Sequence, residues 1–153
     1  MQFSESDEQM MRHALGLAAE AAHAGEIPIG AVIAREGIII ARGRNRNRAE
    51  HNPVRHAEIE AIEAAARELG NERLNGCELF VTKEPCVMCA GAITHARIER
   101  VVIAAEDVKY GAAGTVLSVL GNPLLNHQPR IEFGLLRDES RTLLQEFFRR
   151  LRS

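Results

Sequence analysis

Two short stretches of the sequence combine side chains that bind metals with side chains that move protons. The first is His56-Ala57-Glu58, and the second is Cys86-Val87-Met88-Cys89. Imidazole and thiolate groups are common ligands of zinc in proteins. Three such ligands leave one coordination position for water, as in a catalytic zinc site, whereas a structural site is normally closed by four protein ligands. His56, Cys86 and Cys89 are therefore the predicted metal ligands.

Glu58 is not needed as a ligand, and its carboxyl group is predicted to carry protons. A carboxylate beside a metal-activated water can accept a proton and pass it to a leaving group. The alternative for Glu58 is a first-turn acid that stabilises the helix dipole. The predicted ligands have two alternatives. One is a coincidence of buried cysteines, and the other is a structural zinc site that takes a fourth ligand from Cys77, His51, His95 or His127.

Both stretches lie where helices are predicted to begin. Asn52-Pro53 interrupts the chain before a helix expected over residues 56–69, and Pro85 suits the first position of a helix over residues 86–95. Cys86 and Cys89 would share one face of that helix, in the first turn, where the helix dipole favours thiolates. If the strand that ends at Thr82 is parallel to its neighbours, both helices begin at the same edge of the sheet.

Strands and helices alternate in the rest of the pattern. Ser6 and Gln9 form a capping-box pattern before a helix that extends to Ala24. Two β-rich runs flank Glu36-Gly37 as a predicted hairpin. Further strands are expected from residue 77, around residues 100–104 and near residue 131, and a last helix over residues 138–152. This order predicts an α/β protein with helices on the faces of a sheet, in a single domain over residues 1–153.

Composition restricts the possible partners. A net charge of −2 argues against a general electrostatic attraction to nucleic acid or membranes, and no apolar run is long enough to span a bilayer. Three cysteines fit a metal site in a reducing cytoplasm better than a disulfide scaffold. Basic residues nevertheless cluster in two places, which are solvated faces or phosphate contacts: Arg42, Arg44, Arg46 and Arg48, and then Arg149, Arg150 and Arg152.

Together with "GEIPIGAVI", "RHAEIEAI", "LFVTKEPCVMCAGAI" and "RIERVVIAAEDVKYGAAG", these motifs resemble the bacterial tRNA-specific adenosine deaminases of the cytidine deaminase-like superfamily. The resemblance covers nearly the whole chain. It implies a three-layer α/β/α fold with a mixed five-stranded sheet, a homodimer and one zinc ion per subunit. The implied reaction is hydrolytic deamination of adenosine to inosine at the wobble position of a tRNA anticodon, with an arginine tRNA as the expected substrate.

The resemblance also implies which residues contact the substrate. It implies binding roles for Asn45, Ala57, Asp107, Phe148 and Arg149. From the residues alone, Asn45 could equally be a turn residue, and Asp107 could equally cap a loop. Adjacent helical residues do not share a face. One of Phe147 and Phe148 is therefore predicted to pack on the core and the other to be more exposed.

The segment Asn52-Pro53-Val54-Arg55 departs from the Asp-Pro-Thr-Ala that is usual in the family. Arg55 would place a long cation at the rim of the pocket, where it grips a phosphate or marks a different substrate. The first alternative function is therefore a deaminase of a free base or nucleoside, of the guanine or cytosine type, that uses the same zinc site. The second is an inactive deaminase-fold subunit that only binds RNA or a partner, and the presence of Glu58 argues against it.

Overall fold

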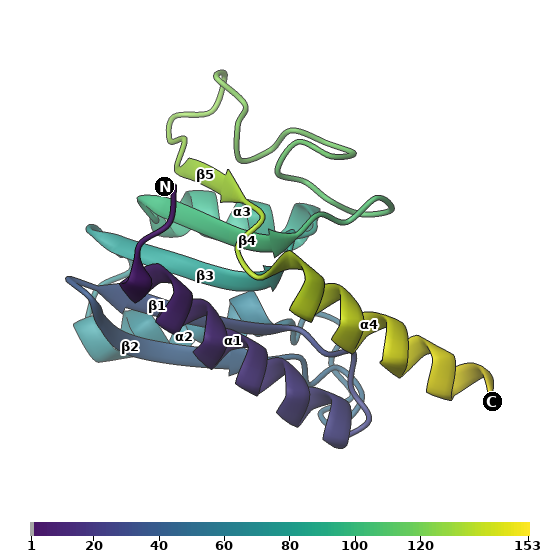
Figure 1. The fold of residues 1–153 in the computed structure, drawn as a ribbon. Coiled ribbons are helices and arrows are strands. Elements are labelled where there is room, and N and C mark those ends of the chain that lie inside the picture. The colour runs from purple at the N-terminus through teal and green to yellow at the C-terminus, as the bar shows by residue number, and fades with distance from the viewer. Residues whose placement is uncertain (1) are drawn as a thin grey trace.

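Five strands form one mixed sheet that lies between two pairs of helices (Figure 1). The computed structural model of the protein describes residues 2–153. Along the chain the elements are α1 (Glu5–His23), β1 (Gly30–Arg35), β2 (Ile38–Arg44), α2 (Ala57–Leu69), β3 (Cys77–Lys83), α3 (Val87–Ala96), β4 (Arg100–Ala105), β5 (Arg130–Phe133) and α4 (Arg137–Arg152). The strands lie in the order β2-β1-β3-β4-β5. The predicted three-layer α/β/α fold with a five-stranded mixed sheet is confirmed.

Strand directions decide where α2 and α3 begin. β1 is antiparallel to both β2 and β3, whereas β3, β4 and β5 are parallel. β3, the strand that was assumed to be parallel to its neighbours, is thus parallel to β4 but antiparallel to β1. Because β1 is antiparallel to the strand on either side of it, β2 and β3 still run in the same direction. The helices that follow β2 and β3 therefore begin at the same edge of the sheet, as the sequence predicted.

The two faces of the sheet are covered by different helices. α2 and α3 lie on one face, and α1 and α4 lie on the other (Figure 1). Leu79 and Phe80, adjacent in β3, belong to two separate apolar clusters, one under each helical layer. This division follows from the period of two along a strand, which sends successive side chains to opposite faces. The sheet is thus buried on both sides and gives α2 and α3 a rigid base.

A buried group of ion pairs around Arg100 joins four elements. The guanidinium group of this β4 residue lies 2.8 Å from the carboxylate of Asp7 in α1 and 3.0 Å from that of Glu78 in β3. It also pairs with Glu132 in β5. The hydrogen bond from Arg100 holds the pKa of Asp7 below its ordinary value. No sequence motif indicates this cluster.

Two helix starts differ from the sequence predictions. The capping box of α1 uses Ser4 and Asp7 instead of Ser6 and Gln9: the Ser4 hydroxyl accepts the Asp7 N–H at 3.0 Å, and the Asp7 carboxylate accepts the Ser4 N–H at 3.0 Å. Pro85 lies before the N-cap of α3 and is not its first helical residue. Over residues 2–153 the structure contains no helix with the length and apolar character needed to cross a membrane.

Candidate active site

The N-caps of α2 and α3 bring the three predicted metal ligands together. His56 is the N-cap of α2 and Cys86 is the N-cap of α3. The Nδ1 atom of His56 lies 3.6 Å from Sγ of Cys86 and 3.5 Å from Sγ of Cys89, and all three ligand atoms lie within 4.8 Å of one another. Among residues 2–153 no fourth His, Cys, Asp or Glu belongs to this group. The arrangement fits a metal with three protein ligands and gives no support to a closed four-ligand site.

The three side chains lie close enough to share protons, which a bound cation would displace. The hydrogen bond with Cys89, together with that to His56, lowers the pKa of Cys86 to about 4. The same contact between the two sulfurs, with burial, raises the pKa of Cys89. The hydrogen bond with Cys86 raises the pKa of His56. One sulfur thus ionises readily, and a donor set of one imidazole and two sulfurs is suited to zinc.

Glu58 lies in the first turn of α2, two residues after His56, and its side chain is buried. It is only 4% exposed, so it is not a surface acid that merely faces the helix dipole. Burial raises the pKa of Glu58 to about 7. A carboxyl group with such a pKa can take up and release a proton near neutral pH, which general acid–base catalysis requires.

Asn45 and Ala57 contact each other directly. Asn45 follows the last residue of β2 and is 4% exposed. Its Oδ1 atom accepts a hydrogen bond from the N–H of Ala57 at 2.9 Å. This bond leaves the amide Nδ2 of Asn45 as its remaining donor group. Asn45 is therefore more than a turn residue, because it connects the sheet edge to the helix that carries Glu58.

Asp107 lies in the loop after β4 and organises that loop. Its Oδ1 atom accepts the N–H groups of Lys109 at 2.9 Å and Tyr110 at 3.1 Å, and Oδ2 lies 3.3 Å from Nζ of Lys83. Burial alone would raise the pKa of Asp107, but these N–H groups and Lys83 hold it below the ordinary value. Asp107 therefore caps the loop, which is one of its two expected roles. Its contact with a substrate stays a prediction.

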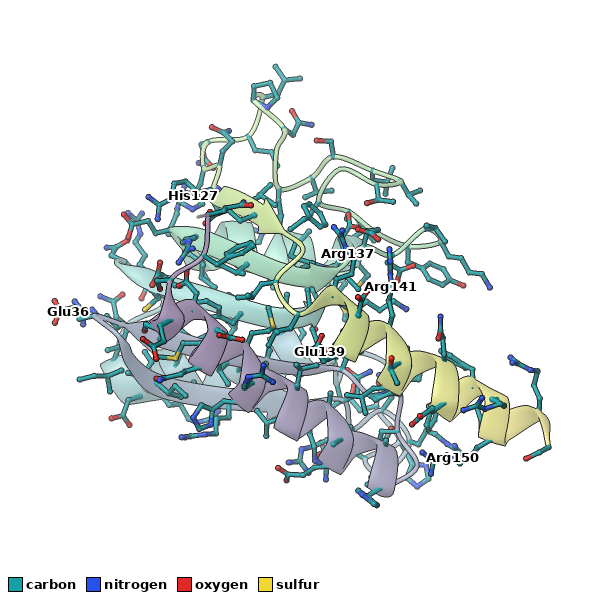
Figure 2. All side chains as sticks on the ribbon, viewed as in Figure 1. Glu36, His127, Arg137, Glu139, Arg141 and Arg150 are labelled. Atoms are coloured by element: carbon teal, nitrogen blue, oxygen red, sulfur yellow. The ribbon has the colours of Figure 1, made fainter. Side chains whose placement is uncertain are left out.

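α4 carries the remaining predicted substrate contacts beyond the edge of the sheet. Arg137 and Arg141, near its start, both pair with Glu106 after β4, and the C-terminal half of the helix projects past the edge at which α2 and α3 begin (Figures 1 and 2). Phe147 is buried and Phe148 half-buried, as predicted, with their rings edge to face at 5.5 Å. Arg149 is exposed.

The arginines near the site are largely paired with acids of α2. Nη1 of Arg55 lies 2.6 Å from the Glu63 carboxylate, and Nε lies 3.3 Å from that of Glu50. Nε of Arg46 lies 2.6 Å from the carboxylate of Glu60. The pairs with Glu60 and Glu63 fasten the loop between β2 and α2 to the helix, whereas the pair of Arg55 with Glu50 lies within the loop. The charge of Arg55 is thus neutralised within the protein, whereas the sequence had suggested a cation directed at a ligand.

Two buried glutamates, which were not among the predicted site residues, hold loops beside the site. The carboxylate of Glu26 accepts the N–H groups of Arg48 at 3.1 Å and Ala49 at 2.8 Å. Glu84 binds the loop after β4 in the same manner. The only sequence signal is that Glu84 directly precedes Pro85-Cys86, and residue type alone would have placed both glutamates on the surface.

Comparisons with known proteins agree with this geometry. The family model of the MafB19-like deaminases matches residues 5–152. The tRNA-specific adenosine deaminase of Bacillus subtilis is 44% identical over 146 residues, which cover 95% of this chain and 91% of that protein. A solved tRNA:A34 deaminase, studied for A-to-I editing at the wobble position of transfer RNA, superimposes with a TM-score of 0.86 at 43% identity, covering 89% of this chain and 99% of that one. A guanine deaminase from Nitrosomonas europaea gives a TM-score of 0.80 at 29% identity, covering 92% and 83%.

The fold and the match over residues 5–152 define a deaminase. Within that class, the chain belongs to the family of tRNA-specific adenosine deaminases.

Proposed function

We propose that this chain catalyses the hydrolytic deamination of adenosine to inosine at the wobble position of a tRNA anticodon, with residues 1–153 acting as one deaminase domain. The observation that carries the proposal is the convergence of His56, Cys86 and Cys89 beside the buried carboxyl group of Glu58. A metal-binding group alone would not indicate a hydrolytic reaction. A buried acid with a pKa of about 7 in the same helix turn is what a hydrolytic reaction requires.

His56, Cys86 and Cys89 would hold one zinc ion per chain. Their three ligand atoms lie within 4.8 Å of one another, which suits coordination to a single ion. When bound, zinc would act as a Lewis acid that makes water reactive near neutral pH. Because the group contains three protein ligands, one coordination position would remain for water or substrate.

Glu58 would move the protons of the reaction. Water replaces the amino group on the adenine ring, its oxygen becomes the carbonyl oxygen of hypoxanthine, and the amine leaves as ammonia. One proton of the water ends on a ring nitrogen and the other on the departing ammonia. A carboxyl group that gains and loses a proton near neutrality can carry both transfers in turn.

The residues that we propose to contact RNA lie at or beyond the same edge of the sheet. A base within a duplex cannot reach a buried acid, whereas an anticodon loop presents unstacked bases. Asn45 and Ala57 would contact the target base beside Glu58, and Asp107 would line the nucleotide pocket. Phe148 and Arg149, on the projecting part of α4, would contact the anticodon loop of an arginine tRNA, with the exposed arginines near Arg150 binding phosphates (Figure 2).

We also propose a homodimer that works in the cytoplasm. Large apolar side chains stand exposed in the segment between β4 and β5, including Val108 at 77%, Tyr110 at 68% and Leu124 at 91%. This segment, with several exposed apolar side chains, is our candidate for the subunit interface. The three free cysteines suit a reducing compartment. Light scattering during gel filtration should give twice the 16.9 kDa of one chain, and a single-chain mass would contradict the dimer.

A free-base deaminase is the second candidate, because the chain also superimposes on the guanine deaminase. Arg55 no longer favours it, since Glu50 and Glu63 already pair with this arginine. A parallel assay separates the two candidates: an anticodon stem-loop with adenosine at the wobble position is scored for inosine, and a panel of free bases and nucleosides is scored for ammonia. Inosine in the stem-loop without ammonia from the panel is expected, and the reverse would overturn the proposal.

A further inference from the structure

The carboxylate of Glu84 is buried at the end of β3, outside the metal-binding group. Glu84 is 3% exposed. Its Oε1 atom accepts the N–H of Asp107 at 3.0 Å, and its Oε2 atom accepts the N–H groups of Ala113 at 2.9 Å and Thr115 at 3.2 Å. The hydroxyl of Thr115 also donates to Oε1. Four donors from the segment 107–115, which we call the Glu84 loop, therefore converge on one carboxylate.

The Glu84 loop is also bonded to the turn that carries a metal ligand. The N–H of Ala112 donates to the carbonyl of Pro85 at 2.9 Å, and Cys86 is the next residue. Gly111 permits the close approach, because a Cβ atom there would lie 2.4 Å from Cδ of Glu84. The same Cβ atom would lie 2.5 Å from the carbonyl oxygen of Asp107, so no side chain larger than hydrogen fits at position 111 unless both the carboxylate and this backbone move. The loop and the ligand turn thus pack as one unit.

We propose that Glu84 is a positioning residue that fixes the Glu84 loop against the Pro85-Cys86 turn. Through Asp107, whose backbone it binds, Glu84 keeps the substrate-facing part of the loop at a constant distance from the metal-binding group. An ionised carboxylate suits this role because it only accepts hydrogen bonds and all four surrounding groups are donors. The effect of Glu84 on substrate binding rests on the proposed function, whereas its effect on the position of the loop does not.

Three substitutions perturb this arrangement in different ways. Glu84→Gln keeps the side-chain size but turns an NH2 group toward N–H donors, so at least one loop donor loses its acceptor. Gly111→Ala leaves the carboxylate chemically intact and displaces it, together with the backbone of Asp107, from the other side. Thr115→Val removes only the hydroxyl donor. The matched controls are Glu36→Gln, at the hairpin turn on the far side of the molecule from α4 (Figure 2), and Gly16→Ala, where an added Cβ meets nothing within 4 Å.

The experiment combines kinetics on the stem-loop with amide hydrogen exchange. Glu84→Gln and Gly111→Ala should raise KM by at least about tenfold, since a small misplacement of binding groups is costly. Zinc content and the circular dichroism spectrum should match the wild type. The amides of Asp107, Ala113 and Thr115 should exchange faster, while that of Ala57, bonded elsewhere, should not. Thr115→Val should give a smaller change in the same direction, and the controls none.

The outcomes distinguish this inference from the proposed function. If the wild type forms no inosine, the proposed function fails, and amide exchange still decides whether Glu84 fixes the loop. If the wild type is active while Glu84→Gln and Gly111→Ala keep both its KM and its amide protection, the inference is overturned. If Glu84→Gln fails to fold or loses zinc, Gly111→Ala and Thr115→Val decide by the same two readouts.

Discussion

Asn45 accepts a hydrogen bond from the N–H of Ala57 across 2.9 Å, and this contact joins the end of β2 to the first turn of α2. His56 and Glu58 flank Ala57 in the chain. The bond therefore fixes the backbone between a predicted metal ligand and the predicted proton carrier. Because Oδ1 binds the helix and Nδ2 remains as a donor, one side chain can orient the site and also contact the substrate.

Removal of the Asn45 side chain should affect stability and activity together. In Asn45→Ala the buried N–H of Ala57 loses its acceptor, so the free energy of unfolding should fall by roughly 1–3 kcal/mol. Inosine formation should also fall, because His56 and Glu58 lose their common support. Denaturant unfolding and steady-state kinetics measure the two effects. Asn75→Ala, at an exposed position, is the control. Unchanged stability in Asn45→Ala would show that the contact has no structural importance.

The zinc content of cysteine variants tests the proposed metal ligands. Elemental analysis should find one zinc ion per chain in the wild type and a large loss in Cys86→Ser and Cys89→Ser. Cys77 is also fully buried but lies at the start of β3, so Cys77→Ala should keep its zinc. The assignment of ligands is wrong if zinc survives dialysis in Cys86→Ser or disappears in Cys77→Ala.

Arg55 should contribute little to catalysis. Its guanidinium group is paired with Glu63 and Glu50, so Arg55→Ala removes a structural contact and not a free cation. Exposed pairs of this kind contribute roughly 0.2–1 kcal/mol to stability, and the value of kcat/KM on the stem-loop should change by no more than about threefold. A gain of ammonia release from a free base in this variant would instead identify Arg55 as a determinant of substrate choice.

Acid should weaken the protein partly through Asp7. Its pKa is lowered in the folded state, so the stability that it adds is fully present above its unfolded pKa and is lost as pH falls through the folded value. The free energy of unfolding of the wild type should therefore drop below about pH 4. Asp7→Asn should be less stable than the wild type at pH 7 and should show a flatter dependence in acid. Urea unfolding over a pH series tests this, and equal slopes for both proteins would contradict it.

The sequence allowed the main elements of the fold to be predicted because apolar periodicity and turn residues are local signals. The start of α1 shows where such signals become ambiguous. Ser4 and Ser6 are each followed, three residues later, by a residue that can complete a capping box. The choice of Ser4 accords with the pairing of Asp7 with Arg100, a residue 93 positions away. A local pattern contains no information about that contact.

The site, like the fold, combines features that local sequence patterns predict with features that depend on distant contacts. The types and spacing of His56, Glu58, Cys86 and Cys89 predict metal and proton chemistry without any coordinates. Their meeting depends on β2 and β3 running in one direction with β1 antiparallel between them, which only the sheet order reveals. Glu84 was not predictable, because its partners, three backbone N–H groups and one hydroxyl, are 23 to 31 residues away. The pairing of Arg55 with Glu63 likewise depends on how the preceding loop folds back on α2.

The most direct test of the central claim compares the wild type with Glu58→Gln on the anticodon stem-loop, with zinc content measured on the same samples. The wild type should convert the wobble adenosine to inosine. Glu58→Gln should keep its zinc and lose at least about 100-fold in kcat, because its amide cannot accept and return a proton. Full activity in Glu58→Gln would contradict the role of Glu58, and an untouched stem-loop with ammonia released from a free base would contradict the substrate.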